Sequence, residues 1–354
     1  MMSEFTESLL QWYRKSGRHD LPWQIDPNSY RVWVSEIMLQ QTQVNTVIPY
    51  YTRFMQAFPD VAQLAEADVD EVLHLWTGLG YYARARNMHK AAQMICREYE
   101  GEVPADLETL ISLPGIGRST AGAILSLSLN QSISILDGNV KRVLARYYAI
   151  AGWPGNKKIE QQLWEKADRH TPKQDCAEYT QAIMDLGATL CTRTKPDCQS
   201  CPVRAGCQAE KQNLQHMFPG KKPKKILPVK QTVFAIIANT EGEVLLEKRP
   251  PSGIWGGLWG FPECTSDQKL VDWLASNRGY VTEIARENAV VRHTFSHFHL
   301  DITPVKLNLL ATEDRIEDKP DQCWYKPDGD LKLGMAAPVK KLIDGLFSTV
   351  VGEH

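Results

Sequence analysis

The chain has 354 residues, of which 43% are hydrophobic and 23% charged, and its formal net charge is −2. This is the composition of a globular protein that is long enough for two domains with separate cores. It contains no run of 18 apolar residues and begins with an acidic, polar segment, which excludes a membrane-spanning helix and a basic signal or transit peptide. We therefore expect a cytoplasmic protein, and its small net charge excludes a surface that is basic throughout.

Charge is distributed unevenly along the chain. Residues 1–230 hold 27 Lys and Arg against 24 Asp and Glu, whereas residues 231–354 hold 13 against 18. The first part is therefore slightly basic and the second part acidic. This permits a local phosphate-binding surface on the first part, and a solvated surface of mixed sign remains the alternative.

The first part of the chain has a helical pattern from residue 5 to about residue 210. Apolar residues recur at steps of three and four, for example at Val34, Ile37 and Met38, and strand-like alternation is nearly absent. We expect a mainly α-helical domain over residues 1–217.

Two acidic residues of this domain lie next to apolar runs. Glu36 lies amid apolar residues in the predicted helix of residues 33–43, and Asp137 follows an apolar run at the apparent start of another helix. By pattern alone, Glu36 is a solvent-facing helix residue and Asp137 is a helix N-cap. The pattern by itself assigns chemistry to neither.

The segment LPGIGRSTAG, residues 113–122, lies between a helical stretch and a second one that is rich in small residues. Gly115 and Gly117 let the turn expose backbone N–H groups at the positive end of the second helix, where an anion fits. This predicts a helix-hairpin-helix over about residues 107–125, which binds DNA through phosphates without reading sequence. A plain helix–helix turn remains the alternative. Four basic residues are candidates to reinforce the phosphate contact: Arg118, Lys141, Arg142 and Arg146.

Four of the eight cysteines fall within one short segment, residues 191–207, and the others are scattered. The cluster consists of Cys191, Cys198, Cys201 and Cys207. Structural zinc usually takes two pairs of closely spaced ligands, and here a single pair has that spacing. Four thiolates in one loop suit a 4Fe-4S cluster, which we favour over zinc. A loop of unligated thiols would be prone to oxidation.

The sequence changes character after this loop. Residues 218–225, FPGKKPKK, have the Pro, Gly and Lys density of a linker, so we place a linker at 218–230 and a second domain at 231–354. For Lys221 to Lys225, contact with DNA phosphates and a solvated spacer both remain open.

Short strands are predicted in the second domain. Residues 232–238 and 244–246, separated by a turn, indicate a hairpin, and the alternation at Phe298, Leu300 and Ile302 indicates a strand with one apolar face. A helix is expected over residues 267–277. The second domain is therefore predicted to be small and α+β.

Five segments together resemble MutY-type adenine DNA glycosylases of the endonuclease III superfamily, in the same order and over essentially the whole chain. They are residues 33–44, GLGYYAR at 78–84, residues 113–122, residues 136–142 and the cysteine loop. The resemblance implies a helix-hairpin-helix glycosylase domain that carries a 4Fe-4S cluster.

The resemblance also implies catalytic roles for the two carboxyls. Glu36 would protonate the ring nitrogen of adenine, and Asp137 would stabilise the oxocarbenium-like sugar and can bond to it before water attacks. Breaking a glycosidic bond needs one protonated and one ionised carboxyl. The apolar neighbours of Glu36 favour a raised pKa, and a helix start favours an ionised Asp137.

The implied DNA contacts follow from the need to take the base out of the stack. Gln41 and Tyr81 match residues that enter the gap in the duplex, and Gln181 matches a position for adenine recognition. Further DNA contacts are assigned to the helix-hairpin-helix and the segment after Asp137, at Gly115, Gly117, Ser119 and Asn139.

Ser119 separates two activities of the superfamily. Members that also cut the strand carry at this position a Lys that forms a Schiff base, and a hydroxyl cannot form an imine. We therefore expect a monofunctional glycosylase that leaves an abasic site, with at most weak lyase activity.

The second domain resembles MutT-like Nudix domains at residues 256–263, GGLWGFPE, but lacks the Nudix carboxylates that bind divalent metal. Nucleotide hydrolysis is therefore not expected. The resemblance instead implies recognition of 8-oxoguanine through Phe295, Ser296 and His297. The alternating histidines at 293, 297 and 299 favour a polar strand face, with a metal site as the alternative.

These observations predict a monomeric repair enzyme that removes adenine mispaired with 8-oxoguanine or G in double-stranded DNA. A bifunctional enzyme for oxidised pyrimidines is opposed by Ser119 and the second domain. An iron-sulfur protein without catalysis is opposed by Glu36 and Asp137, and a Nudix hydrolase by the missing metal ligands.

Overall fold

The computed structural model describes residues 2–223, 226–265, 269–312, 319–327, 329 and 331–348. Its contacts divide the chain into two units. The helical unit holds residues 1–66 and 87–224, and the second unit holds residues 67–86 and 225–354. No described helix is long and apolar enough to cross a membrane.

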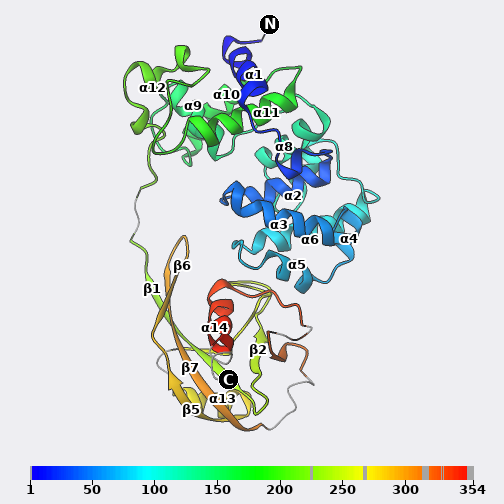
Figure 1. Ribbon diagram of the computed structural model, residues 1–354, viewed down its shortest axis with the longest axis vertical. Coiled ribbons are helices and arrows are strands. Elements are labelled where there is room, and N and C mark those ends of the chain that lie inside the picture. Colours follow the sequence, from blue (N-terminus) through cyan, green and yellow to red (C-terminus); the bar gives the residue numbers. More distant parts are fainter. Residues whose placement is uncertain are drawn as a thin grey trace. The chain divides into compact units, whose positions relative to one another are not determined.

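The helical unit confirms the predicted mainly α architecture (Figure 1). Its elements are α1 (Glu4–Ser16), η1 (Pro22–Gln24), α2 (Ser29–Leu39), α3 (Val44–Ala57), α4 (Val61–Glu66), α6 (Ala83–Glu98, from residue 87), α7 (Leu107–Ser112), α8 (Arg118–Leu129), α9 (Gly138–Tyr147), α10 (Lys157–His170), α11 (Cys176–Asp185), η2 (Leu186–Leu190), η3 (Arg204–Gly206), α12 (Gln208–Lys211) and η4 (Gln215–Met217).

Short polar side chains begin several of these helices. Ser3, Asn28, Asp106, Asp137 and Asn156 lie directly before α1, α2, α7, α9 and α10, and each accepts a hydrogen bond from a first-turn N–H. Each such cap contributes about 1 kcal/mol of helix stability. The sequence thereby fixes where α9 begins, and with it the position of Asp137.

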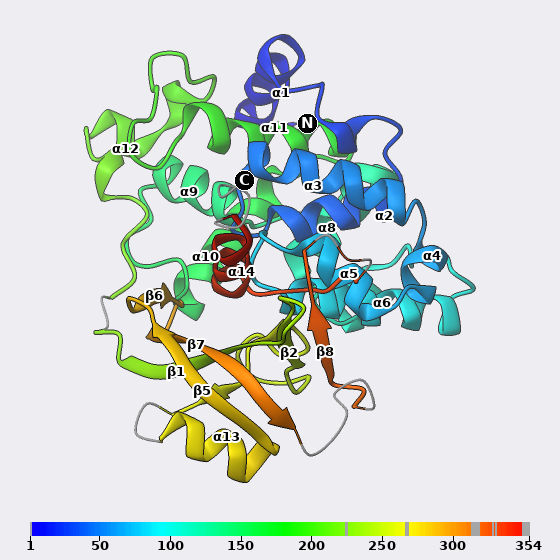
Figure 2. The same ribbon diagram turned by 60° about the horizontal axis from the view of Figure 1, so that its bottom comes forward.

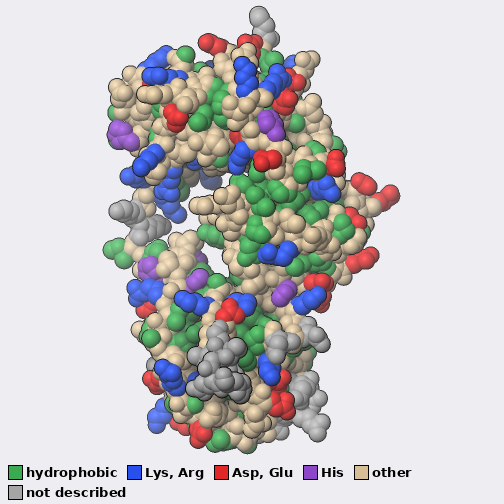
Figure 3. Space-filling model, viewed as in Figure 1, with side chains coloured by type: hydrophobic (Ala, Val, Ile, Leu, Met, Phe, Trp, Pro, Cys, Tyr) green, Lys and Arg blue, Asp and Glu red, His purple; other side chains and the backbone are tan. Residues whose placement is uncertain are grey.

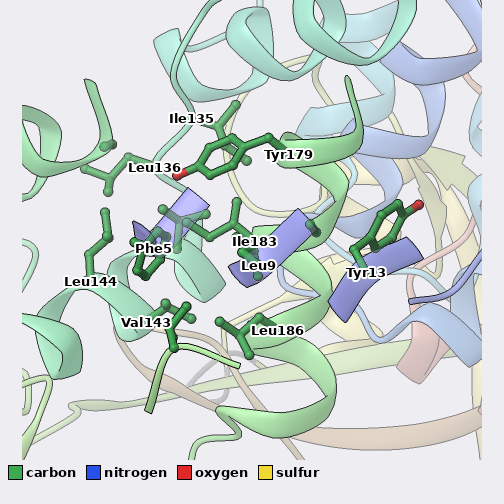
Figure 4. Packing of buried hydrophobic residues seen from close by; sticks show 14 of the residues in the cluster. Phe5, Leu9, Tyr13, Ile135, Leu136, Val143, Leu144, Tyr179, Ile183 and Leu186 are labelled. Atoms are coloured by element: carbon green, nitrogen blue, oxygen red, sulfur yellow. The ribbon is translucent and has the colours of Figure 1, made fainter. Parts of the chain in front are cut away.

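The core of the helical unit forms where α1, α9 and α11 meet (Figure 4). Phe5 and Leu9 of α1 pack with Leu144 of α9 and Ile183 of α11, and none of the four is more than 3% exposed. Leu136 belongs to the same cluster. The residue before Asp137 is therefore held in the core.

The second unit is built on a mixed sheet with strand order β3-β2-β1-β7-β5 (Figure 2). In addition, β4 pairs with β1, β6 with β7 and β8 with β2. β1 and β7 are parallel, and the other pairs are antiparallel. The elements are β1 (Val229–Ala238), β2 (Val244–Lys248), β3 (Trp259–Gly260), β4 (Glu263–Cys264), α13 (Leu270–Arg278), β5 (Tyr280–Glu287), β6 (Val291–Thr294), β7 (His299–Thr312), β8 (Gln322–Tyr325) and α14 (Ala337–Ser348).

The α+β prediction for this part is confirmed, with shifts in detail. The predicted hairpin is β1–β2, in which Ala238 pairs with Val244. The predicted helix of 267–277 begins at Leu270, and residues 266–268 lie outside the described residues. The predicted strand around Leu300 is β7, which buries alternate side chains as expected and extends to Thr312.

Residues 67–86, which include α5 (Val69–Trp76), belong to the second unit although they lie far from residues 225–354 in the sequence. Asp70 Oδ2 accepts from Lys248 Nζ at 2.9 Å and from Trp259 Nε1 at 3.1 Å. The Tyr82 hydroxyl donates to the Met335 carbonyl at 2.6 Å. The predicted continuous helical domain over residues 1–217 does not anticipate these contacts, because they join residues far apart in the sequence.

Candidate active site and cysteine site

Glu36 lies on α2, whose neighbouring residues Trp33 and Val34 are fully buried. Burial, and secondly the negative charge of Asp137, raise the pKa of Glu36 to about 8. The two carboxyls, far apart in the sequence, are thus close enough to interact. At neutral pH Glu36 holds its proton and is equipped to donate it.

Asp137 lies at the N-cap of α9. It accepts hydrogen bonds from the Val140 N–H at 2.8 Å and from Asn139 Nδ2 at 3.1 Å. Burial raises its pKa, while these bonds and the positive charge of Arg142 act in the opposite direction. The predicted N-cap is therefore present, but burial opposes the ionised form that the helix start favours. The hydrogen bonds assign the ionised role to Asp137 rather than to Glu36.

Arg142 donates its hydrogen bonds to other groups of the protein. Its guanidinium donates to Asn139 Oδ1 at 2.8 Å, to the Cys191 carbonyl at 2.7 Å and to the Gly187 carbonyl at 2.5 Å. Asn139 is thus held between Asp137 and Arg142. Both residues orient the carboxyl and the cysteine loop, and these bonds occupy the Arg142 donors that a phosphate would need.

The predicted helix-hairpin-helix is formed by α7 and α8. Its two glycines, Gly115 and Gly117, lie in different surroundings. Gly115 has a φ of +81°, and a Cβ there would lie 2.9 Å from Cβ of Asn87. Gly117 is the N-cap of α8, and a Cβ there would meet nothing within 4 Å. Its open surroundings leave the first N–H groups of α8 accessible to an anion.

Ser119 and Arg118 contact protein groups. Ser119 Oγ accepts from the Leu136 N–H at 2.9 Å, which joins α8 to the residue before Asp137. Arg118 lies 3.9 Å from the ring centre of Trp164 and pairs with Asp168 at 3.3 Å. Ser119 is therefore a support for Asp137 in this structure. Both basic and acidic side chains lie on the face shown in Figure 3.

A cavity of about 230 Å³ in the helical unit lies against α2, the helix that holds Glu36. It is larger than the ~150 Å³ cavity that admits benzene in another protein. Val32 and Ser35 of α2 reach it from the turn that holds Glu36, and Gln181 reaches it from α11. The remaining lining residues are Tyr13, His19, Trp23, Gln24, Pro27, Leu127, Ala177 and Glu178.

The four predicted cysteines line one pocket together with apolar residues such as Leu186 and Leu190. Burial raises the pKa of Cys201 to about 12, and the nearby thiols add to the shift. Arg146 Nη1 donates to Cys191 Sγ at 3.3 Å. A free Cys201 thiol would therefore stay protonated at neutral pH, and bound metal would be needed to hold it as a thiolate.

The donor set fits an iron-sulfur cluster. Four sulfurs surround a common apolar pocket, and donors such as Arg146 and Gln215 are aimed at them. Within the part of the chain that the structure describes, no three His, Cys, Asp or Glu residues are grouped as ligands of a single metal ion.

In the second unit, residues 295–297 form the turn between β6 and β7. Phe295 stacks on the buried Phe298 with ring centres 4.5 Å apart, and it lies 5.2 Å from Trp255. Ser296 and His297 are exposed and lie 3.3 Å from each other, Oγ to Nδ1. The turn thus presents two polar side chains on an aromatic base.

The predicted metal alternative for the histidines finds no support in their contacts. His299 Nδ1 contacts Thr294 Oγ1 at 2.9 Å, while His293 packs between Phe295 and Trp255.

Gln41 and Tyr81 are exposed and both have left-handed backbone, with φ of +57° and +49°. Such angles are uncommon for residues other than glycine, and they cluster at functional sites. Gln41 belongs to the helical unit and Tyr81 to the second.

In the linker, Lys224 and Lys225 lie outside the described residues, and Lys222 Nζ lies 5.6 Å from the ring centre of Trp153.

Comparisons with known proteins cover both units. A model of the HhH-GPD superfamily base excision DNA repair proteins matches residues 34–169, and a NUDIX domain model matches residues 233–345. The adenine DNA glycosylase of Buchnera aphidicola subsp. Acyrthosiphon pisum is 42% identical over 347 residues, which are 98% of each chain. The chain belongs to the adenine DNA glycosylase family.

Other members and structures agree with this assignment. The human adenine DNA glycosylase is 36% identical, covering 96% of this chain and 73% of its own. A solved thermostable thymine-DNA glycosylase matches 59% of this chain and 95% of its own, with a TM-score of 0.53 and 24% identity, and so shares the helical fold. The predicted fold class and family are thereby confirmed.

The cavity of this adenine DNA glycosylase family member contains residues that the sequence patterns did not single out. Trp23 and Gln24 lie in its wall, and Asp185 contacts Gln181 from behind. No short motif marks Trp23 or Gln24. Asp185 had a signal, because it interrupts the apolar run around Ile183 and Leu186, and a polar residue in such a run is normally paired.

Proposed function

We propose that this protein hydrolyses the N-glycosidic bond of adenine mispaired with 8-oxoguanine or G in double-stranded DNA. The observation that carries this proposal is the raised pKa of Glu36 beside Asp137. The names of the relatives agree with adenine as the base released. The cavity lined by Val32 and Ser35 of α2 offers space for a flipped base, and Gln181 in its wall supports a role in adenine recognition.

In the proposed reaction, Glu36 gives its proton to a ring nitrogen of adenine. The bond between the sugar C1′ and the base nitrogen then breaks, and its electron pair leaves with the neutral base. Asp137 stabilises the cationic sugar by charge or by a transient bond. Water finally adds its hydroxyl to C1′, and its proton returns to Glu36.

We further propose that the enzyme is monofunctional and leaves an abasic site. A Schiff base needs an amine, and the residue at the corresponding position is Ser119, whose hydroxyl is engaged with the Leu136 N–H. The exposed N–H groups at the start of α8 are candidates to hold a backbone phosphate, with Gly115 and Gly117 allowing the approach.

For the cofactor, we propose a 4Fe-4S cluster held by Cys191, Cys198, Cys201 and Cys207. A cluster with four thiolate ligands has no open position for substrate, so its contribution is to hold the loop of residues 191–207 in shape. Arg142 connects that loop to Asn139 and the start of α9.

The second unit is proposed to read the base opposite adenine. Ser296 and His297 can hydrogen-bond an oxidised purine, and Phe295 can stack on it or wedge beside it. Gln41 and Tyr81 are proposed to fill the gap in the duplex. A monomeric state and a cytoplasmic location stay predictions.

One assay tests the proposal. The protein is incubated with duplexes that carry A opposite 8-oxoguanine, A opposite G, or an oxidised pyrimidine, and free base and strand breaks are measured before and after alkali. Adenine release with breaks that appear after alkali is expected. Release of the pyrimidine alone, or breaks without alkali, would overturn the proposal.

A further inference from the structure

Residues 333–336 connect the sheet of the second unit with residues 67–86 through backbone groups. The Gly334 carbonyl accepts from the Trp259 N–H at 2.9 Å, and Met335 forms a β-bridge with Trp259 of β3. All four residues are buried, so their polar backbone groups need partners within the protein. We call residues 333–336 the C-terminal connector.

The Met335 backbone is bound by both ends of the turn of residues 77–82. Its N–H donates to Thr77 Oγ1 at 3.3 Å, and its carbonyl accepts from the Tyr82 hydroxyl at 2.6 Å. The same hydroxyl accepts from the Gly78 N–H at 3.3 Å. Tyr82 therefore closes the turn and joins it to the C-terminal connector through a single oxygen atom.

The C-terminal connector also packs directly against α5. A Cβ at Gly334 would lie 2.4 Å from Cβ of Leu73, which is closer than packed carbon atoms approach each other. His74 Nδ1 lies 3.2 Å from the Leu333 carbonyl oxygen. A larger residue at position 334 would therefore push α5 and the C-terminal connector apart.

Tyr81 lies within the turn of residues 77–82 and is 51% exposed. Its backbone has a φ of +49°, and Gly78 and Gly80 have φ of +103° and +70°. A residue other than glycine keeps such a conformation only where the surrounding structure holds it. The half-exposed ring lies 5.5 Å from the Arg84 guanidinium. The backbone of the turn therefore sets the direction in which the ring points.

We propose that Tyr82 is a positioning residue, whose bonds to Gly78 and Met335 hold the turn in the conformation that presents Tyr81 to the duplex. This inference rests on the proposed role of Tyr81 in filling the gap, and it adds the groups that orient it. Because Met335 is bridged to β3, the turn that carries Tyr81 is anchored to the same sheet as the 295–297 turn. The two proposed contacts on the second unit thus share one support.

The first experiment is a double-mutant cycle on the full chain. Kd is measured for a duplex with a non-cleavable 2′-fluoro adenine nucleotide opposite 8-oxoguanine, using wild type, Tyr82→Phe, Tyr81→Ala and the double variant. Tyr81→Ala should raise Kd about tenfold through lost stacking, and Tyr82→Phe about threefold to fivefold because the ring is less well oriented. In the Tyr81→Ala background, Tyr82→Phe should change Kd less than about twofold. Equal effects of Tyr82→Phe in both backgrounds, or no effect of either single change, overturn the proposal.

A spectroscopic measurement reports the ring itself. 2-Aminopurine is placed on the 5′ or the 3′ side of the 8-oxoguanine, where a ring that stacks on it lowers its fluorescence. In the duplex that responds to Tyr81→Ala at saturating protein, Tyr82→Phe should give an intermediate fluorescence, and a wild-type value contradicts the positioning role. The matched control is Tyr280→Phe, which removes a buried hydroxyl that donates to Gln322 in the same unit at 2.7 Å and should leave Kd and fluorescence unchanged.

Thr77 and Gly334 give independent ways to loosen the turn. Thr77→Val removes the oxygen that accepts from the Met335 N–H, whereas Thr77→Ser keeps it. Thr77→Val should therefore raise Kd about threefold and Thr77→Ser should bind like the wild type. Gly334→Ala perturbs the same junction from the C-terminal connector and should also raise Kd about threefold. If folded Thr77→Val and Gly334→Ala proteins both bind like the wild type, the proposal fails, and these variants decide the question should Tyr82→Phe not fold.

The outcomes also separate this inference from the proposed function. If the wild-type protein releases no adenine from any duplex, the proposed function fails, while the cycle on the non-cleavable duplex still reports whether Tyr82 acts through Tyr81. If adenine is released but the effects of Tyr82→Phe and Tyr81→Ala are additive, the inference alone fails.

Discussion

Both carboxyls of the proposed active site in the helical unit lie against the protein interior, whereas Ser296 and His297 in the second unit project from an exposed turn. Asp137 has a hydrogen-bonded helix start and a core residue before it, and Glu36 has a buried helix around it. The 295–297 turn has an aromatic base and one polar contact between its exposed side chains. The proposed chemistry thus lies where the protein controls protonation, and the proposed recognition lies where a partner can reach it.

This difference predicts the size of mutational effects. A general acid that protonates the leaving base is required for the reaction, so its loss should remove orders of magnitude from the rate. An exposed contact competes with water and should change selectivity by smaller factors.

The largest effect is expected for Glu36→Gln, which keeps the shape of the side chain and removes its proton. Single-turnover release of adenine should fall about a thousandfold, while binding to a non-cleavable duplex is retained. Glu165→Gln, on the exposed face of α10, is the matched control. A Glu36→Gln protein with a wild-type rate would remove the basis of the proposed mechanism.

The same variant has a stability signature. The pKa of Glu36 is about 8 in the folded protein against 4.5 for an ordinary Glu, so between these values the folded state holds a proton that the unfolded state has lost. Wild-type stability therefore falls as pH rises through this window. Thermal melts from pH 5 to 9 should show the Tm of Glu36→Gln gaining on that of the wild type.

The pH dependence of the rate gives the next largest effect. Because the reaction needs Glu36 protonated, the single-turnover rate should fall about tenfold for each pH unit above 8. It also needs Asp137 ionised, and burial raises the pKa of Asp137, so the acid limb should lie above the range of an ordinary Asp. Duplex affinity measured across the same range is the control, and a rate that stays level from pH 8 to 10 would exclude Glu36 as the acid.

The reader turn should respond differently. The double variant Ser296→Ala with His297→Ala should lower the ratio of the rates for A opposite 8-oxoguanine and A opposite G by about tenfold, with most of the loss on the 8-oxoguanine duplex. The exposed Ser276→Ala on α13 is the control. An unchanged ratio would assign the recognition of the opposite base to another surface.

Local features carried most of what the sequence could predict. The helical first part, the β1–β2 hairpin and the N-cap at Asp137 follow from periodicity, turn residues and capping, which act over a few residues. The family resemblance then brought Glu36 and Asp137 together, which no local pattern does. Their proximity depends on the packing of α2 against α8, which is a long-range feature of the folded structure.

Local sequence patterns could not predict contacts between segments that are far apart in the chain. Inside the second unit, residues 67–86 are joined to residues after 225 by hydrogen bonds of single side chains such as Asp70 and Tyr82. The ion pair of Arg18 with Asp185 likewise joins residues far apart in the sequence. Ser119 shows the same limit. Its place in the sequence predicted that it cannot form a Schiff base, but it did not predict the hydrogen bond from the Leu136 N–H.

The smallest effect is expected for Ser119→Ala, which tests whether that bond helps to place Asp137. Leu136 is buried, so its N–H would lose its partner, and stability should fall by about 1–3 kcal/mol. The rate should fall only about threefold, since Asp137 keeps its bonds from Val140 and Asn139. The exposed Ser112→Ala is the control, and strand breaks should still require alkali. A loss as large as that of Glu36→Gln would mean that the Ser119 hydroxyl takes part in the chemistry, and the division between the buried acid and its supports would then have to be redrawn.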